Sequence, residues 1–347
     1  MKETALHSPR HQIHSILQEV DELKILITTT SRLPVEKYGG TERVIWCLAK
    51  ELNELGHKIV FLAAPNSYCS FAEIISYTKE DDIRRLIPED VDVVHFNSDL
   101  PEDVQFPYVL TQHGNCPKGS ILDKQTIFVS SNHAERYGSS TYVHNGLDWS
   151  EEHFDKCKRN GFHFLGKAAW RRKNVRGAIS TTMRVKKAKL HVLGGSRLNF
   201  SMGFRFTVNP RVKFHGMVND EYKNEVMQRS EGLVFPVRWN EPFGLALIES
   251  LYCGCPVFGT PYGALPEIVT DEVGFLSNKS DELSEALKNA TSWSSISCRE
   301  YAVEQFNSQK MAYEYLKYYE KAINGGFLNE KSPKATSDPN TILPWFN

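Results

Sequence analysis

The sequence alternates short apolar runs, of the kind that form buried strands, with longer runs that have helical periodicity. Residues 23–30, 58–64 and 92–96 are rich in Val, Ile, Leu and Phe, and residues 41–55 have the spacing of an amphipathic helix. Strands that are apolar on both faces are typical of parallel sheets, and parallel strands need a crossover connection between them. The pattern therefore predicts an α/β fold built on doubly wound parallel sheets.

This alternation runs through the chain twice. It continues with strand-like runs at residues 108–112 and 127–130, weakens over residues 145–158 and begins again at residue 162. The second series contains strand-like runs at 162–165, 189–193, 212–215, 232–236 and 256–259. Two series predict two Rossmann-like domains. Because ligands of such sheets bind beyond the carboxyl ends of the strands, we expect the functional site in a cleft between the domains.

The charge balance and the cysteines narrow the class of protein. The 347 residues include 41 Lys+Arg and 42 Asp+Glu, and a formal charge of −1 does not favour a nucleic-acid-binding protein. No apolar run is long enough for a transmembrane helix, and residues 1–22 lack the apolar core of a signal peptide. The 7 cysteines form no C-x-x-C pair, which is typical of reduced thiols. We therefore expect a cytoplasmic protein without a transmembrane segment, and peripheral membrane contact stays open.

The most informative segment is residues 232–267, in which Glu241 and Glu249 stand eight positions apart. A loop that holds Glu241 leads into a predicted helix, and the first helical amides, at residues 243–245, have no acceptor within the helix. Such a helix N-terminus favours phosphate or sugar oxygens. Glu249 lies among apolar residues, where a carboxylate needs donors such as ligand hydroxyls. A structural ion pair or a solvent-facing Glu249 is the alternative that these residues leave open.

The spacing of the two glutamates matches the E-x7-E motif of retaining glycosyltransferases with the GT-B fold, and the surrounding sequence resembles glycosyltransferase family 4, the glycosyl transferases group 1. Motifs of that family stand in order over residues 23–323. They are Tyr38-Gly39-Gly40, His113, Asn145-Gly146-Leu147-Asp148, Gly166-Lys167 with Lys173, Thr260 and Gly263–Glu267. The resemblance implies a GT-B fold and the metal-independent, retaining transfer of a hexose from a nucleotide diphosphate sugar. UDP is the commonest donor nucleotide of the family, no further cofactor is implied, and the acceptor would be a small molecule or a glycan.

The resemblance also implies a role for each residue that matches a family motif. Glu249 would bind the ribose hydroxyls of the donor, since two adjacent hydroxyls can donate to one carboxylate. Glu241 would contact the transferred hexose as a catalytic residue. The backbone amides of Phe243, Gly244 and Leu245 would hold sugar or phosphate oxygens.

A basic loop at residues 164–174 would bind the diphosphate of the donor. By the resemblance, Lys167 and Lys173 would stabilise the negative charge that accumulates on the leaving group. Lys167 departs from the family pattern, which has arginine at this position. Because a lysine cannot form two parallel hydrogen bonds to a phosphate, Arg171 or Arg172 would have to compensate. A basic loop that is merely solvated is the alternative.

Two further parts of the predicted site lie in the N-terminal half. Gly39 and Gly40 follow the first strand and open a helix, which would let the backbone approach a phosphate or an acceptor. His113 follows the strand-like run 108–112, and the resemblance places it beside the reactive sugar as a catalytic residue. A merely polar or loop-capping histidine is the alternative. Asp90-Val91-Asp92 is similar to the metal-binding D-x-D of other glycosyltransferases, but it leads directly into a buried strand, so we predict no metal site.

Other functions use the same fold and stay open at this point. A sugar-nucleotide epimerase, or an inverting transferase with His113 as the general base, would need the same cleft. A catalytically silent protein that binds a sugar nucleotide is a further alternative, because a fold does not determine a function. The sequence contains neither G-x-G-x-x-G nor a P-loop motif, which argues against an oxidoreductase or an NTPase.

The same considerations predict the limits of the domains. We expect an N-terminal extension at residues 1–22, an acceptor-side domain at 23–152 and a donor-binding domain at 153–307. Residues 308–324 contain a predicted helix, which packs back on the N-terminal domain in related proteins. Residues 325–347 contain a Gly-Gly pair, three prolines and few apolar residues, which predicts a loosely ordered tail.

Overall fold

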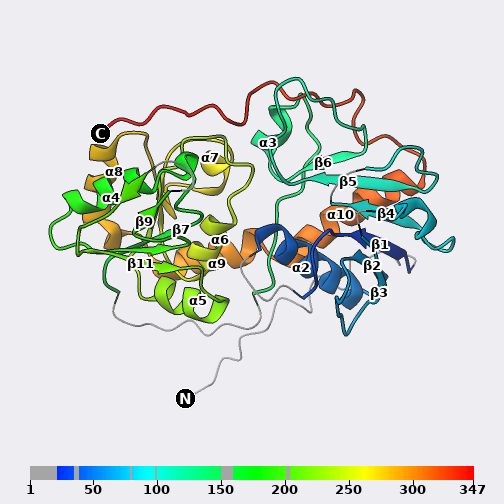
Figure 1. Ribbon diagram of the computed structural model, residues 1–347, viewed down its shortest axis with the longest axis horizontal. Helices are drawn as coiled ribbons and strands as arrows, with labels where there is room; N and C mark the ends of the chain where they lie inside the picture. The colour runs from blue at the N-terminus through cyan, green and yellow to red at the C-terminus, as the bar shows by residue number, and fades with distance from the viewer. Residues whose placement is uncertain (1–21, 35–38, 79, 98–99, 150–158, 201–203) are drawn as a thin grey trace, which may run out of the picture.

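The computed structural model describes residues 22–347 apart from 35–38, 79, 98–99, 150–158 and 201–203. It contains two parallel six-stranded sheets, one in each half of the chain, with helices packed on them (Figure 1). The predicted α/β class with two Rossmann-like domains is confirmed. Tyr38, residues 1–21 and most of the segment around the predicted boundary lie outside the described residues, and the domain limits stay predictions.

The N-terminal sheet has the strand order β3-β2-β1-β4-β5-β6, and all of its pairings are parallel. Each strand-like run predicted in this half forms a strand. The prediction missed β3, because this four-residue edge strand is only partly buried and lacks the apolar run of the others. The strands are β1 (Lys24–Thr28), β2 (Lys58–Ala63), β3 (Glu73–Ser76), β4 (Val93–Phe96), β5 (Tyr108–Gln112) and β6 (Thr126–Phe128).

The C-terminal sheet has the order β11-β8-β7-β12-β13-β14 and repeats the same winding. This order is the Rossmann arrangement, in which ligands bind where the winding changes direction. Its strands are β7 (Phe162–Leu165), β8 (Leu190–Leu193), β11 (Val212–Gly216), β12 (Leu233–Phe235), β13 (Val257–Gly259) and β14 (Gly274–Leu276). A separate antiparallel hairpin pairs β9 (Leu198–Asn199) with β10 (Arg205–Phe206). The prediction missed β14, an edge strand that is only partly buried, and the hairpin, whose strands have two residues each.

Helices connect the parallel strands and cover the sheets. The first of them, α2 (Gly40–Glu54), matches the predicted 41–55 within one residue and buries one apolar stripe against the sheet. The other helices are α3 (Ser131–Glu135), α4 (Val175–Arg184), α5 (Asp220–Gln228), α6 (Leu245–Tyr252), α7 (Leu265–Ile268), α8 (Ser280–Lys288), α9 (Ser295–Gln305) and α10 (Ser308–Ile323). Within the described part of the chain, none of the helices combines the length and apolar character needed to cross a membrane.

The last helix, α10, packs on the N-terminal sheet although it follows the C-terminal sheet in sequence (Figure 1). The hydroxyl of Tyr319 lies 2.7 Å from Nδ1 of His95, and the hydroxyl of Tyr315 lies 3.0 Å from Oγ1 of Thr111. The same Thr111 hydroxyl lies 2.7 Å from Nε2 of His95, and burial lowers the pKa of this histidine to about 3. His95 is therefore a neutral, fully bonded core residue that joins α10 to β4 and β5.

Residues 325–347 extend from the N-terminal half to the C-terminal half along one side of the molecule (red in Figure 1). The amide of Leu328 donates to Oε1 of Gln125 at 3.0 Å. Further along, the amide of Leu343 donates to the backbone oxygen of Arg238 at 2.8 Å, and Arg238 Nε donates back to the Leu343 oxygen at 2.8 Å. The expectation of a loosely ordered tail is wrong, because its backbone groups find partners in both halves, and such bonds do not depend on apolar composition.

Candidate functional site

The N-terminus of α2 lies against the N-terminus of α6, and this contact helps to join the two halves. A Cβ atom on Gly40 would lie 3.0 Å from Cδ1 of Leu245, so a larger residue would press on that side chain. Gly39 is the N-cap of α2 and has an ordinary extended conformation. Ser130, which follows β6, donates from Oγ to the backbone oxygen of Pro242 at 2.6 Å. Residues that follow two N-terminal strands thus meet the loop that precedes α6.

The start of α6 supplies backbone donors. No described residue accepts a hydrogen bond from the amides of Phe243, Gly244 and Leu245. Gly244 has a φ of 97°, a left-handed conformation that glycine adopts without strain, and it turns the chain into the helix. The Phe243 ring packs between His144 and Phe306, so only the backbone of this residue is available to a ligand. The predicted helix N-terminus therefore offers donors for phosphate or sugar oxygens.

Glu249 is buried in α6 beside two cations. Its Oε1 accepts from the Lys223 ammonium group at 2.6 Å and from the Arg43 guanidinium group, while Oε2 is buried and has no partner among the described residues. Lys223 is itself buried and also bonds Asp220 at 2.6 Å. Burial favours the neutral form of Glu249, but Lys223 and Arg43 outweigh it and lower the pKa of this carboxyl. Glu249 is thus an ionised carboxylate with one oxygen occupied.

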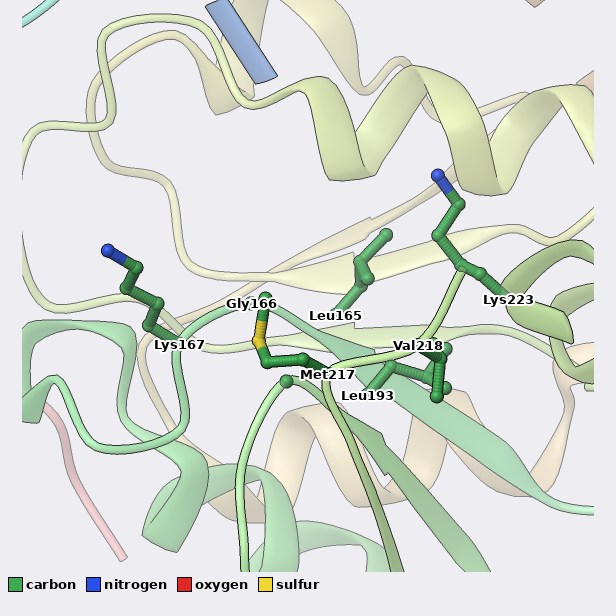
Figure 2. Close-up of a pocket in the computed structure, with 8 residues that line it drawn as sticks. Leu165, Gly166, Lys167, Leu193, Met217, Val218 and Lys223 are labelled. Atoms are coloured by element: carbon green, nitrogen blue, oxygen red, sulfur yellow. The ribbon is translucent and has the colours of Figure 1, made fainter. Parts of the chain in front are cut away.

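A pocket adjoins Lys223 at the carboxyl ends of β7, β8 and β11. It is lined by Leu165, Gly166, Lys167, Leu193, Gly194, Met217, Val218 and Lys223. Figure 2 shows the amino groups of Lys167 and Lys223 on the same side of this pocket, with apolar side chains between them. A Cβ atom on Gly194 would lie 2.4 Å from the backbone oxygen of Gly166, so glycine is required for these two loops to meet. The pocket thus combines apolar walls with two cations.

Glu241 is held in the loop between β12 and α6. Its Oε2 accepts from the Lys173 ammonium group at 2.7 Å and from the Trp239 indole nitrogen at 2.8 Å. The backbone around it is tightly packed, since a Cβ atom on Gly263 would lie 2.2 Å from the Glu241 amide nitrogen. The structure therefore brings together two residues for which the sequence predicted separate contacts, Glu241 with the hexose and Lys173 with the diphosphate.

The predicted basic loop forms a single 3₁₀ turn at Arg171–Lys173. The guanidinium group of Arg172 lies between two indole rings, 4.3 Å from the centroid of Trp170 and 4.2 Å from that of Trp239. Lys173 is largely buried, whereas Arg171 and Lys167 are exposed. The alternative of a merely solvated basic loop therefore holds for Arg171 but not for Lys173.

His113 lies directly after β5, as predicted. Its Nε2 lies 2.8 Å from Oδ1 of Asn97, and burial lowers the pKa of the imidazole to about 4. Two residues further on, Asn115 donates from Nδ2 to the backbone oxygen of Asn240 at 2.8 Å. This bond brings the end of β5 close to the loop that carries Glu241.

The acidic pair of the Asp90-Val91-Asp92 segment lies at the opposite end of the sheet. Asp92 accepts from the amide of Lys24 at 2.6 Å, and Asp90 accepts from the Lys24 ammonium group at 2.7 Å. Lys24 is the first residue of β1, so these carboxylates lie at the amino ends of the strands. Their interactions agree with the interpretation of this segment as a polar lead-in to β4.

Three residues that contact the two glutamates were absent from the sequence-based site. Arg43 had a weak signal, since it stands one helical turn after Gly40 and so on the same side of α2. Trp239 stands two residues before Glu241 and could have been included on that ground. Lys223 had no local signal, because nothing in α5 distinguishes a lysine that turns toward another helix.

Comparison of sequences supports the resemblance found in the E-x7-E segment. Residues 159–292 match the family model described as glycosyl transferases group 1, and this range includes both glutamates. A phosphatidyl-myo-inositol mannosyltransferase from Propionibacterium freudenreichii subsp. shermanii is 34% identical over 65 residues, which are 19% of this chain and 17% of that protein. The chain thus aligns with less than two thirds of the length of this curated relative.

Comparison of structures covers nearly the whole chain. AviGT4, a glycosyltransferase involved in avilamycin A biosynthesis, is similar with a TM-score of 0.73 and 20% identity over 88% of this chain and 99% of that one. Anabaena Alr3699/HepE in complex with UDP-glucose is similar with a TM-score of 0.62 and 15% identity over 86% of this chain and 100% of that one. The predicted resemblance is therefore confirmed: this chain is similar to the glycosyl transferases group 1 and has the two-domain fold of GT-B glycosyltransferases.

Proposed function

We propose that this chain is a hexosyltransferase that uses a nucleotide diphosphate sugar, with UDP as the nucleotide, and retains the configuration of the sugar. The observation that carries the proposal is that Glu241, held by Lys173, precedes α6 and Glu249 lies within it, while the amides of Phe243, Gly244 and Leu245 at the helix start find no acceptor among the described residues. The match of residues 159–292 to the glycosyl transferases group 1 supports the activity. The similar Anabaena protein was crystallised with UDP-glucose, which supports the choice of donor.

In this proposal the ribose of the donor binds to Glu249. Its Oε2 lacks a partner among the described residues, and a buried carboxylate oxygen gains from a hydrogen-bond donor. Lys223 and Arg43 hold Oε1 and keep the group ionised, so a ribose hydroxyl would meet a fixed, charged acceptor. The neighbouring apolar pocket would take the flat face of the base.

The transfer step would use the other glutamate and its lysine. The acceptor oxygen bonds to the anomeric carbon on the face from which the nucleoside diphosphate departs. The bond from that carbon to the diphosphate oxygen breaks, and the acceptor proton passes to the departing oxygen. Trp239 would keep Glu241 in place against the hexose, while Lys173 would turn from Glu241 to the diphosphate as negative charge builds there. Lys167 lies at the pocket rim as a second cation, so the charge would be met without a divalent metal.

The burial of His113 argues against the inverting alternative. A general base works best when its pKa lies near the working pH, and burial lowers the pKa of His113 to about 4. The imidazole is therefore neutral at pH 7 but a weak proton acceptor. We propose that His113 acts through hydrogen bonds to the sugar rather than as a base.

UDP should raise the melting temperature of the protein more than GDP, ADP or dTDP, and it should do so in EDTA. Ligand at about 100 times its Kd adds about 2.7 kcal/mol to stability, which for a chain of this size is a shift on the order of 5 °C. A thermal-shift panel with and without attached sugars measures this. Loss of both the shift and donor turnover on adding EDTA would contradict the metal-independent proposal.

Lys173→Ala should weaken binding of UDP but leave binding of uridine nearly unchanged, because the ammonium group acts on the diphosphate. Loss of such a contact should cost on the order of 2–4 kcal/mol in the transition state. Calorimetry with UDP and uridine, together with donor-turnover rates, measures the effect. Arg171→Ala is the matched control, since it removes an equal charge from an exposed position of the same turn. Equal losses for uridine and UDP would place Lys173 elsewhere.

A further inference from the structure

The β9–β10 hairpin presents an apolar face to solvent. Arg205 pairs with Asn199 and Phe206 with Leu198, so side chains alternate between two faces along the hairpin. One face carries Leu198, Phe200, Phe204, Phe206 and Val208, whose exposed fractions range from 44% to 75%. The rings of Phe200 and Phe204 lie 5.7 Å apart, which makes this face continuous. An exposed patch of this kind marks an interaction site in a folded protein.

The opposite face of the hairpin is polar and turned inward. Arg205 is buried, and its guanidinium group lies 4.8 Å from the centroid of the Phe214 ring. It donates to the backbone oxygen of Ser196 at 2.8 Å and to the hydroxyl of Thr207 at 3.1 Å. The arginine thus anchors the hairpin to the C-terminal sheet while the phenylalanines point away, which is the reverse of the usual distribution.

The segment that contains the hairpin is strongly cationic. Residues 159–219 contain fourteen Lys and Arg residues and no Asp or Glu, although the whole chain has a formal charge of −1. Arg176 donates to the backbone oxygen of Phe204 at 2.5 Å, which places an exposed cation beside the apolar face. Burial, and then repulsion by Arg176, lowers the pKa of Arg205.

We propose that the β9–β10 hairpin docks this chain on an anionic lipid surface. Its apolar side chains would enter the boundary between headgroups and acyl chains, and the exposed Arg176 would contact the headgroups. The proposal goes beyond the glycosyltransferase function and does not depend on it. Two observations favour lipid over other occupants. A second copy would bring the Arg176 guanidinium groups of two cationic segments together, and like charges there would repel. A nucleic acid would need cations interleaved with the stacked rings, whereas here the cation flanks them.

Sedimentation with vesicles tests the proposal. Wild-type protein should sediment with vesicles of phosphatidylcholine and phosphatidylglycerol, should bind pure phosphatidylcholine vesicles far less, and should be released by salt. The double variant Phe200→Ser/Phe206→Ser should have an affinity for the anionic vesicles that is lower by roughly tenfold or more. Each ring that the lipid buries contributes to the binding free energy in proportion to its apolar area. Arg176→Gln should weaken binding at low salt and change it little at high salt. Tyr68→Ser is the matched control, since it removes an equally exposed aromatic residue from the N-terminal half.

The outcomes separate this proposal from the glycosyltransferase assignment and from a folding defect. The hairpin variants should keep the wild-type melting temperature and UDP affinity, since the altered side chains are exposed. Equal vesicle binding by wild type and the phenylalanine variant would overturn the proposal. The proposal would also be overturned if the wild-type protein bound a single-stranded oligonucleotide but did not bind vesicles. A wild-type dimer that the phenylalanine variant converts to a monomer, with no vesicle binding, would overturn it in favour of a second copy.

Discussion

Glu249→Ala lowers the free energy of unfolding by about 3–5 kcal/mol, because it removes the principal counter-charge of a buried lysine. Asp220, which also bonds Lys223, is half-exposed and compensates a buried charge less well. Arg43 would lose its shortest contact as well. Urea unfolding measures the change. A loss below about 1 kcal/mol would mean that the ion pair contributes no more than a surface pair does.

Glu249→Ala should also bind the nucleotide weakly. A double variant separates this loss of binding from the loss of folding stability. Glu249→Ala/Lys223→Met removes both buried charges and should recover most of the lost stability, since an apolar replacement of a buried pair is often neutral. It should still fail to bind UDP. Lys223→Met alone is the matched control, because it keeps the carboxylate. If the double variant bound UDP as tightly as Lys223→Met, Glu249 would not contact the ribose.

Kinetics provide a second measure of the Glu249 assignment. The ribose does not change during the transfer, so losing its contact weakens the ground state and the transition state together. Glu249→Ala should therefore raise KM more than it lowers kcat. A fall in kcat at unchanged KM would contradict the assignment.

The stability that Glu249 supplies should depend on pH. The pKa of its carboxyl is lowered in the folded protein because Lys223 and Arg43 outweigh the effect of burial. The unfolded-state pKa of a glutamate is about 4.3. Because the folded-state pKa is lower, ionised Glu249 stabilises the fold at any pH above about 4.3, and this stabilisation is lost as the pH falls through the folded-state pKa. The stability difference between wild type and Glu249→Gln should therefore be largest near neutral pH and shrink in acid.

Glu241→Ala should lower kcat by about 10²-fold or more, which corresponds to about 3 kcal/mol, and should leave binding of free UDP nearly intact. In the proposed mechanism this carboxylate contacts the hexose while charge develops at the anomeric carbon, so its effect belongs to the transition state. Donor turnover and calorimetry with bare UDP measure the two quantities.

Trp239→Phe is a milder test of the same carboxylate. It removes the indole donor to Glu241, 2.8 Å away, and keeps an aromatic ring beside Arg172. We expect a smaller fall in kcat than for Glu241→Ala, with UDP binding unchanged. If Glu241→Ala abolished UDP binding while Glu249→Ala did not, the two assigned roles would be reversed.

Much of the fold could be predicted from the sequence, because the signals are local. The helix α2 has its apolar residues three and four positions apart, and the central strands β1, β2 and β4 are continuous apolar runs. The E-x7-E spacing indicated the loop and helix that carry Glu241 and Glu249. These features depend on neighbouring residues and on the regular geometry of one element.

Edge strands and the tail could not be predicted in the same way. β3 and β14 lie at sheet edges and are only partly buried, so they lack the continuous apolar run that marks the similarly short inner strand β12. Hydrogen bonds from the backbone of residues 325–347 hold the tail to both halves. No local apolar pattern in the sequence predicts these bonds. Such bonds require only a partner at the right distance, and the partner is set by the rest of the fold.

The sequence by itself determined the two wound sheets and the presence of two glutamates near the start of a helix, α6, which it placed a few residues before the observed start at Leu245. Only the tertiary structure decided what those glutamates bind. Arg43 stands 206 positions from Glu249 in sequence, and Lys173 stands 68 positions from Glu241. Helix and strand periodicity result from contacts between residues close in sequence, whereas each of these ion pairs forms because separate elements pack together. Packing alone selects which cation reaches a buried carboxylate and which of its oxygens lacks a partner among the described residues.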